Sequence, residues 1–432
     1  MGLVPESPSP SGSLAWDQLQ ALAPPPPDRV RGVTNAQAQL RLFRSSESEV
    51  RVTLYRDHHA WCPYCQKVWL WLEEKQIPYR IRKVTMNCYG DKESWYRQRV
   101  PSGMLPALEL DGRLITESDL ILAALEAAFG PLERPLEDPE VLALRQLERR
   151  LFRAWCQWLC CTGEAGPASE PAERHFEKMA VLVEAALAVH EGPWFLQSLS
   201  CVDLIFTPYL ERMGASLSYY KGYGLRQCHP ALDRWFSALE QRSTYLGTQS
   251  DFHTHAHDLP PQMGRCLASG TAAQVACAAQ IDQGPWITPH DGSGGSGTGP
   301  AAVAASPVLE TRQLEPPGAA LEALARVLKH RHTLVAVNPY SGAGFDQALA
   351  CALTRLVGGG VACLPPPGSA PGLRYLRDRI CVPRDMSLHA ARRLRQALES
   401  TAQADPAGAL EAPTPIPTNQ RRDQDPRRFA PA

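Results

Sequence analysis

The chain has 432 residues, of which 44 are Lys or Arg, 45 are Asp or Glu, and 44% are hydrophobic. This length exceeds one ordinary core and predicts two or three domains. The near-zero net charge argues against extended nucleic-acid binding, which needs a basic face to meet phosphates. No apolar run approaches the roughly 18 residues of a transmembrane helix. We therefore expect neither nucleic acid nor membrane as a partner.

Thirteen cysteines lie at uneven spacing along the chain. Secreted disulfide frameworks are usually short, dense and even in cysteine number. The first 13 residues also lack the basic start and the apolar stretch of a signal peptide. We therefore expect a soluble intracellular protein in a reducing compartment, with most cysteines serving as small buried hydrophobic residues.

Proline and glycine divide the chain. Four consecutive prolines occur at 24–27, a Gly- and Ser-rich segment occupies 291–300, and proline recurs in 401–432. Such compositions are typical of extended or flexible chain. We predict a largely irregular N-terminal extension over 1–45, a flexible 291–300 and a disordered tail over 401–432. A G-x-G-x-x-G spacing at 292–297 has no strand before it, so it does not indicate a dinucleotide site.

The first structured region begins near residue 50 and predicts a small mixed α/β domain over 46–132. Alternating apolar residues predict strands, and a 3.6-residue period predicts helices. Asp111-Gly112 is a favoured hairpin turn between two of these strands. The order is β-α-β, a loop, and β-β-α. The predicted strands cover 50–56, 79–86, 107–110 and 113–116, and the predicted helices begin near Gln66 and Ser118.

Strand patterns disappear after Pro139, and long helical patterns replace them. We predict an all-helical domain over 133–250 and a mainly helical C-terminal extension over 251–400. Ser200 and Asp203 have the spacing of a capping box at the start of one helix. The helical patterns cover 142–159, 175–189, 200–213, 230–241, 321–329, 345–357 and 388–399.

Cys62-Pro63-Tyr64-Cys65 lies between a predicted strand and a predicted helix. Unpaired backbone N–H groups at a helix N-terminus favour negative charge, so a thiol there is stabilised as thiolate. Pro63 fits the first helical position, and Cys65 lies one turn further on, near enough to close a disulfide with Cys62. The motif predicts redox or thiol chemistry. A zinc half-site or a pair of core cysteines are the alternatives.

Two further features accompany the cysteine motif. Leu105-Pro106 immediately precedes the third strand, where a cis proline in a thioredoxin-like domain faces the reactive cysteine. Glu117 and Ser118 begin the last helix of the domain, where free backbone amides form an anion-binding corner. A plain N-cap by Thr116 or Ser118 explains this second feature about as well.

The segments CPYC, MLPALELDG and ITESD, followed by a helical unit, resemble the glutathione transferase family, in particular its cysteine-type branches. The resemblance covers roughly 50–250. The segments 251–264 and 376–387 are similar to the C-terminal region of the iota class, which occurs in photosynthetic organisms. This resemblance implies a thioredoxin-like N-terminal domain, an all-helical domain and an extra helical module, in chloroplast or cytoplasm.

The resemblance also implies the site residues and the ligands. Glutathione is the expected substrate, and no metal is expected. Cys62 and Cys65 are the expected catalytic residues, and Trp155 and Trp158 lie on the helix that would border a second-substrate pocket. The expected partners are small electrophilic, disulfide or glutathionylated molecules, with a second copy or another protein at the C-terminal extension. The glutathione contacts expected are Pro63, Tyr64, Lys92, Leu105, Pro106, Glu117 and Ser118.

The predicted function is glutathione-dependent thiol transfer or reduction, in which Cys62 forms a mixed disulfide with glutathione. The substrates are expected to be glutathionylated molecules, disulfides or dehydroascorbate. A non-catalytic ligand-binding or redox-regulated scaffold of the same fold is the alternative. The enzymatic hypothesis requires the Cys62 sulfur to lie beside 105–106 and 117–118 and to be reached from solvent.

Two other patterns are assigned to structure. His253, His255 and His257 alternate, and on a strand they would share one face as metal ligands do. We expect polar packing instead, since no other ligands are close in sequence. Seven arginines between 374 and 395 interleave with aspartates, which predicts a solvated, salt-bridged face.

Overall fold

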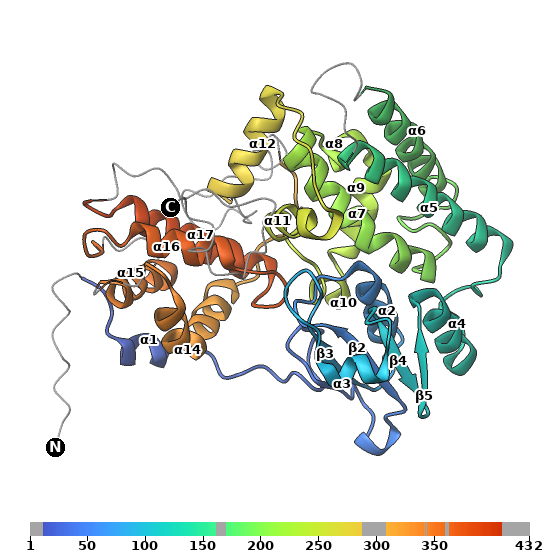
Figure 1. Cartoon of the computed structure of the whole chain (residues 1–432), viewed down its shortest axis with the longest axis horizontal. Helices are drawn as coiled ribbons and strands as arrows, with labels where there is room; N and C mark the ends of the chain where they lie inside the picture. The colour runs from blue at the N-terminus through green and yellow to red at the C-terminus, as the bar shows by residue number, and fades with distance from the viewer. Residues whose placement is uncertain are drawn as a thin grey trace.

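The computed structural model describes residues 12–160, 170–286, 308–340, 342, 344–358 and 363–407. Figure 1 shows three groups of elements: a sheet with its covering helices, a central group of helices, and a C-terminal group of helices. The C-terminal helices lie on the β3 side of the sheet, away from α4 and β5. Within the described residues, no helix is both long enough and apolar enough to cross a membrane.

The sheet has five strands in the order β1-β3-β2-β4-β5. Strands β2 and β3 are parallel because a helix crosses between them, whereas the other neighbours are antiparallel. Leu54 in the central strand pairs with Ile81 on one side and Leu108 on the other. The strands are β1 (Leu40–Arg41), β2 (Val52–Asp57), β3 (Tyr79–Val84), β4 (Ala107–Leu110) and β5 (Arg113–Thr116).

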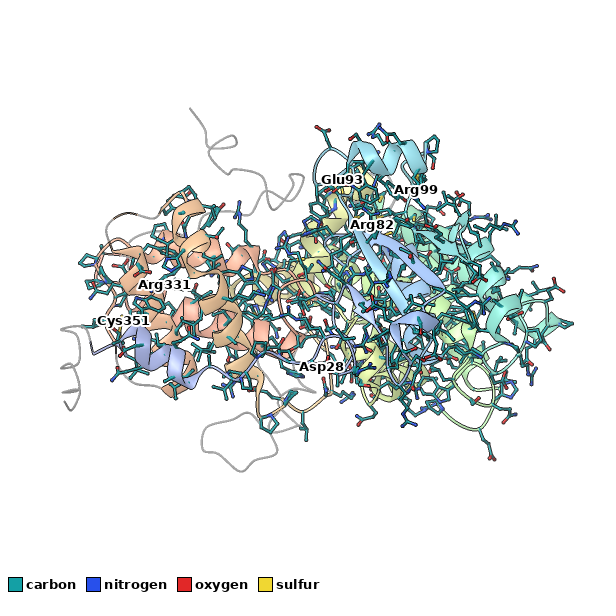
Figure 2. All side chains as sticks on the ribbon, turned by 90° about the horizontal axis from the view of Figure 1, so that it is seen from below. Asp28, Arg82, Glu93, Arg99, Arg331 and Cys351 are labelled. Atoms are coloured by element: carbon teal, nitrogen blue, oxygen red, sulfur yellow. A yellow bond between two sulfur atoms is a disulfide. The ribbon has the colours of Figure 1, made fainter. Side chains whose placement is uncertain are left out.

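Helices α2 (Pro63–Glu74) and α4 (Ser118–Phe129) pack against this sheet, and their buried side chains share a core cluster with it. Asp111 and Gly112, with φ of 50° and 80°, form the β4–β5 turn, as the sequence predicts. The thioredoxin-like β-α-β and β-β-α order is therefore confirmed. One short helix, α3 (Ser94–Arg99), was not predicted; Figure 2 shows Arg82, Glu93 and Arg99 around it.

The central helices pack around α7 (Cys201–Lys221), in which every residue from Cys201 to Tyr220 is buried. Its predicted capping box is present: Asp203 Oδ2 accepts hydrogen bonds from the Ser200 N–H and Oγ, each at 2.8 Å. The other helices here are α5 (Pro139–Cys160), α6 (Glu170–Leu187), α8 (Leu225–Cys228), α9 (Pro230–Leu239) and α10 (Ser243–Leu246).

The C-terminal extension is mainly helical. Helices α11 (Phe252–Met263) and α12 (Ala272–Gln283) pack on α7, and the sequence analysis predicted neither. Pro260 and Pro261, which lie in the last turn of α11, obscure its helical pattern. The remaining helices pack around α17: they are α14 (Ala319–Val337), α15 (Phe345–Gly358), α16 (Ala370–Arg379) and α17 (Leu388–Gln403) itself.

Both chain ends differ from the sequence prediction. Helix α1 (Trp16–Leu22) lies against α14 and α15 and buries Leu19 completely, and β1 pairs with β3. The N-terminal extension therefore packs against both the C-terminal helices and the sheet. Its apolar residues show no periodic pattern in the sequence, but they contact cores that are formed by residues far along the chain. At the other end, α17 continues into the predicted tail; 408–432 and 291–300 lie outside the described residues.

The arginine-rich stretch is salt-bridged, as predicted, but four of its arginines are buried and the other three are half-buried, so it is not a solvated face. Arg377 pairs with Asp378 at 2.7 Å, and Arg395 pairs with Asp251, with all four side chains at most 7% exposed. The interleaved charges lie in the interior because α16 and α17 pack against each other.

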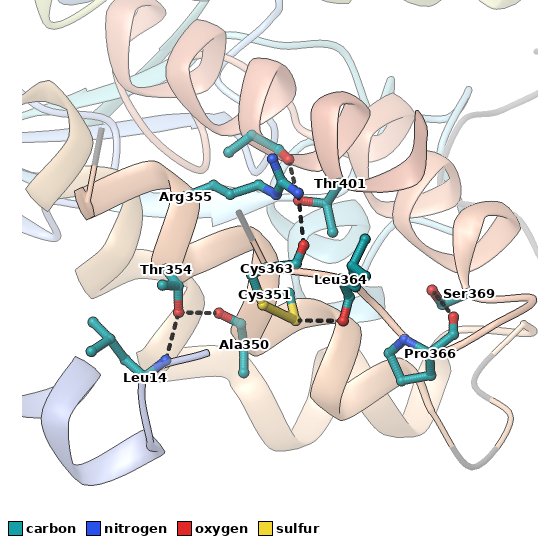
Figure 3. The surroundings of a disulfide bond; sticks show 11 residues. Leu14, Ala350, Cys351, Thr354, Arg355, Cys363, Leu364, Pro366, Ser369 and Thr401 are labelled. Atoms are coloured by element: carbon teal, nitrogen blue, oxygen red, sulfur yellow. Dashed lines mark hydrogen bonds between the residues drawn. A yellow bond between two sulfur atoms is a disulfide. The ribbon is translucent and has the colours of Figure 1, made fainter. Parts of the chain in front are cut away.

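A Cys351–Cys363 disulfide joins α15 to the segment after it (Figure 3). It lies in the C-terminal group of helices, where Figure 2 labels Arg331 and Cys351. This pair departs from the predicted buried free thiols.

Candidate functional site

Cys62 is the N-cap residue of α2, and Pro63 occupies the first turn of that helix. The Cys62 carbonyl accepts the Gln66 N–H at 3.0 Å, so the helix begins at the cysteine as predicted. The Cys62 residue is 5% exposed and Cys65 is 1% exposed, whereas Tyr64 between them reaches solvent. Cys62 therefore lies at the helix N-terminus and is almost fully buried.

Asp57, at the end of β2, lies beside both thiols. One oxygen of Asp57 and the sulfur atoms of Cys62 and Cys65 lie within 4.8 Å of one another. Asp57 Oδ2 accepts the Trp61 N–H at 2.6 Å, while Oδ1 has no hydrogen-bond partner among the described residues. Burial raises the pKa of Cys65 well above its usual value, and a hydrogen bond to Cys62 and the charges of Cys62 and Asp57 raise it further. Cys65 is thus held as a thiol.

A cationic side chain from the helical lobe reaches the same loop. Arg212 on α7 is fully buried, donates to the Trp61 carbonyl and to Gln66 Oε1 at 3.0 Å, and lies 4.6 Å from the centre of the Trp61 ring. Burial lowers the pKa of Arg212, whereas the charges of Glu211 and Cys62 raise it. The sequence gives no direct signal for this residue, because 151 positions separate it from Trp61.

These cations bear on the zinc alternative. Asp57, Cys62 and Cys65 are close enough together to hold a metal ion. Arg212 and Lys92, however, interact electrostatically with the same sulfur atoms, and their positive charges oppose a further cation. These charges argue against zinc at this group.

The Leu105–Pro106 peptide bond is cis, as predicted. Leu105 is partly buried and packs against the core cluster that includes Cys62 and Cys65. The backbone before Pro106 is fixed by Tyr96, whose hydroxyl donates to the Met104 carbonyl at 2.6 Å. Leu105, before the cis proline, therefore packs on the same core cluster as the two cysteines.

Glu117 is the N-cap residue of α4, has a φ of 65° and is exposed, whereas Ser118 is buried. No side chain caps this helix, so the simple N-cap by Thr116 or Ser118 is not what the structure shows. The helix therefore starts with backbone amides that no side-chain oxygen satisfies.

Lys92 lies close to the thiols, but its ammonium group already donates to the Thr85 carbonyl at 2.8 Å. Burial lowers the pKa of Lys92, and the charges of Cys65 and Cys62 raise it. Its proposed contact with a glutathione carboxylate remains a prediction.

Trp155 and Trp158 are core residues, 2% and 4% exposed, and Trp155 donates to Ser216 Oγ at 2.9 Å. None of the described cavities is lined by either side chain. Their role beside a second substrate also remains a prediction.

A second aromatic cluster, which the sequence analysis missed, lies next to the exposed Tyr64. Its ring meets Tyr209 edge-on at 6.0 Å, and Tyr209 meets Phe152 at 5.2 Å. The guanidinium of Arg149 lies 4.8 Å and 4.7 Å from the Phe152 and Tyr209 rings. These side chains offer an apolar and cationic surface beside the cysteine motif. The sequence did contain a signal for this cluster: Arg149 and Phe152 are three residues apart, which places them on one face of a helix.

The three alternating histidines lie on helix α11, not on a strand. The helix places His255 toward Trp61, with ring centres 6.1 Å apart, and groups His253 and His257 with Asp282 of α12. His257 Nε2 lies 2.7 Å from Asp282 Oδ1. Arg395 lies 3.5 Å from His253 Nδ1, and its charge opposes a metal ion at this group.

Comparisons with known proteins agree with this geometry. Residues 61–128 match the family model of the glutathione S-transferase N-terminal domain. In this segment the chain is therefore similar to glutathione transferases. Two Arabidopsis thaliana proteins are each 27% identical to this chain over 44% of its length: glutathione S-transferase DHAR2, covered over 84% of its length, and glutathione S-transferase L3, covered over 79%.

Among solved structures, this chain is similar to glutathione transferase Omega 3C from Trametes versicolor. The two share 24% identity with a TM-score of 0.40, over 55% of this chain and 97% of that one. The matches to DHAR2 and L3 each cover 44% of this chain.

Proposed function

We propose that this protein is a glutathione transferase that catalyses glutathione-dependent thiol transfer or reduction with Cys62 as the nucleophile. The observation that carries the proposal is the position of Cys62 as N-cap of α2, beside a buried Cys65 thiol and the cis Pro106. A helix N-terminus and a nearby guanidinium both favour the thiolate that attacks disulfides.

Glutathione is the proposed substrate, bound across the loops around Cys62. Its α-carboxylate would accept hydrogen bonds from the uncapped amides at the start of α4, at Ser118, and its ammonium would meet Glu117. The backbone of Leu105, before the cis Pro106, would bond the cysteinyl part. Pro63, Tyr64 and Lys92 complete the proposed contacts.

The proposed reaction begins when the Cys62 thiolate attacks the glutathione sulfur of a disulfide R–S–SG. A Cys62–glutathione disulfide forms, and R–S⁻ leaves and takes up a proton. A second glutathione thiolate then attacks the glutathione sulfur, releasing oxidised glutathione and restoring Cys62. In the alternative second step, Cys65 loses its proton to the open Asp57 oxygen and attacks Cys62, which releases glutathione and forms the Cys62–Cys65 disulfide.

The same thiolate serves the other proposed substrates. With dehydroascorbate, two glutathione molecules supply the two electrons and two protons, and Cys62 carries the first glutathione as a mixed disulfide. The side chains of Tyr64 and Phe152 are the proposed contact for the second substrate, because they lie beside the motif and reach solvent, with the buried Tyr209 ring in contact with both.

A non-catalytic ligand-binding protein is the second candidate. The observation that favours it is the 5% exposure of Cys62, which restricts attack on bulky substrates. Tight glutathione binding without turnover would support this candidate.

We also propose that the protein belongs to the iota class and is located in the chloroplast or the cytoplasm. The proposed domain limits are 46–132, 133–250 and 251–400.

The test is mass spectrometry of the full chain after treatment with oxidised glutathione, together with turnover of a glutathionylated peptide. Cys62→Ser should lose both the adduct and the activity. Cys228→Ser is the matched control, because Cys228 is exposed and lies outside the proposed site. Wild-type activity in the Cys62→Ser protein would end the proposal.

A further inference from the structure

A cavity of about 1000 Å³ lies between the thioredoxin-like lobe and the C-terminal extension. Its wall combines the loop before Cys62, through His58 and His59, with Lys83 of β3 and with residues of α14, α16 and α17. Neither cysteine of the motif lines it, nor do 105–106 or 117–118. The cavity is therefore separate from the proposed glutathione site, and its volume is that of a small-molecule pocket.

The wall of this cavity carries more positive than negative charge. Lys83, Arg326, Arg379 and Arg384 line it, together with two aspartates. One of these, Asp385, is already held by both arms of Arg384, at 2.9 and 3.0 Å. The lining therefore has an excess of cationic groups for a ligand to neutralise.

Lys83 shows this excess most directly. No described residue forms an ion pair or side-chain hydrogen bond with its ammonium group. Burial lowers the pKa of Lys83 to about 8, and the neighbouring Arg56, Arg29 and Arg326 lower it further. Burial also lowers the pKa of Arg326; the charges of Asp385 and Glu322 raise it, and those of Arg29 and Arg384 lower it, with a net shift downward. Cations held together without sufficient counter-charge destabilise a fold, and binding sites commonly retain such a cost.

The remaining wall is apolar. Inorganic anions alone would leave these side chains exposed to water, whereas an organic body would cover them. Specific small-molecule pockets typically combine such a lining with a few convergent polar groups. The apolar lining residues include Val327, Leu334, Val337, Leu376, Met386 and Leu394.

We propose that this cavity binds an organic anion with at least two negative charges on one end and an apolar body. Lys83 and Arg326 would bind the charged end, which is either a phosphate or a group of carboxylates. Because His58 and His59 belong to the loop that leads to Cys62, the ligand would also contact the segment before the nucleophile. The proposal does not depend on the proposed thiol chemistry.

The test uses the fluorescent probe 8-anilinonaphthalene-1-sulfonate, which joins an aromatic body to an anionic group, on the full chain. Saturating S-hexylglutathione is added first to occupy the proposed glutathione site. The probe fluorescence that remains is then assigned to probe bound in the cavity. Inorganic pyrophosphate and citrate are then added as competitors. Displacement by either one supports the proposal and identifies the charged group; displacement by neither would overturn it.

The double variant Lys83→Gln/Arg326→Gln should weaken the remaining probe binding by about tenfold or more, since two charge-assisted contacts are removed. Arg174→Gln/Lys178→Gln on exposed helix α6 is the charge-matched control and should bind the probe normally. Thermal unfolding of the Lys83→Gln/Arg326→Gln protein shows whether it is folded. Unchanged probe affinity in the folded double variant would overturn the proposal, whether or not the protein has glutathione-dependent activity.

Discussion

Arg212 of helix α7 donates a hydrogen bond to the carbonyl of Trp61, the residue immediately before Cys62. The same guanidinium also donates to Gln66 Oε1 and to the Pro208 carbonyl. One buried cation therefore fixes the loop and first turn that carry the nucleophile, and it connects them to the helical lobe.

Replacing Arg212 by Met leaves two buried carbonyl oxygens and Gln66 without their donor. We expect the free energy of unfolding to fall by about 3–5 kcal/mol, the range for breaking a buried charge interaction. The reaction of Cys62 with iodoacetamide at pH 7 should also slow, because a nearby positive charge is lost. Urea denaturation and adduct mass spectrometry measure the two effects. Arg212→Lys should restore the reaction rate more than the stability, since an ammonium group cannot make the same set of bonds.

Cys65 is predicted to be dispensable for turnover with excess glutathione. Its pKa is raised by burial, by Cys62 and by Asp57, so the thiolate needed to resolve the mixed disulfide is scarce. Cys65→Ser should therefore retain most of the activity on a glutathionylated peptide, while Cys62→Ser loses it. Steady-state rates of the two variants provide the measurement. An equal loss in both would instead establish the route through the Cys62–Cys65 disulfide.

Glu211 should make stability depend on pH. Burial raises its pKa to about 7, from an ordinary value near 4.5. The folded state then binds a proton that the unfolded state releases between pH 4.5 and 7, so this contribution is complete below 4.5 and is lost as the pH rises through 7. Glu211→Gln keeps a group that can contact Gln66 but cannot ionise. We expect the variant to gain stability over wild type at pH 8, and to lose that gain at pH 4.5, in urea titrations.

The local parts of the fold were readable from the sequence. The alternation in β2 and β3, the Asp111-Gly112 turn and the Ser200–Asp203 capping box each depend on neighbouring residues, and all are present. The cis Leu105–Pro106 bond was predicted through the resemblance to thioredoxin-like domains.

Long-range features were not readable in the same way. Arg212 and Trp61 meet only after the two lobes pack, and Leu19 is buried only against α14 and α15. The alternation of His253, His255 and His257 did not reveal helix α11, because the packing of this helix on α7 depends on residues that are distant in sequence. The basic cavity likewise requires the C-terminal helices to meet β3.

Lys83→Met tests the energetic cost of the basic cavity. The folded pKa of Lys83 is about 8, below its ordinary value of 10.5. Below pH 8 the lysine is charged in both states, and the cost of burial and repulsion is present in full. Between pH 8 and 10.5 the folded state loses the proton first, so the wild type becomes more stable as the pH rises.

We therefore expect Lys83→Met to be more stable than wild type at pH 7, and this advantage to shrink as the pH approaches 10. Urea denaturation at both pH values measures it, and Lys178→Met on exposed α6 controls for general effects of losing a lysine. A constant difference between Lys83→Met and wild type at both pH values would mean that the charge is not strained. A higher stability combined with weaker probe binding would identify Lys83 as a residue kept for a ligand at the expense of the fold.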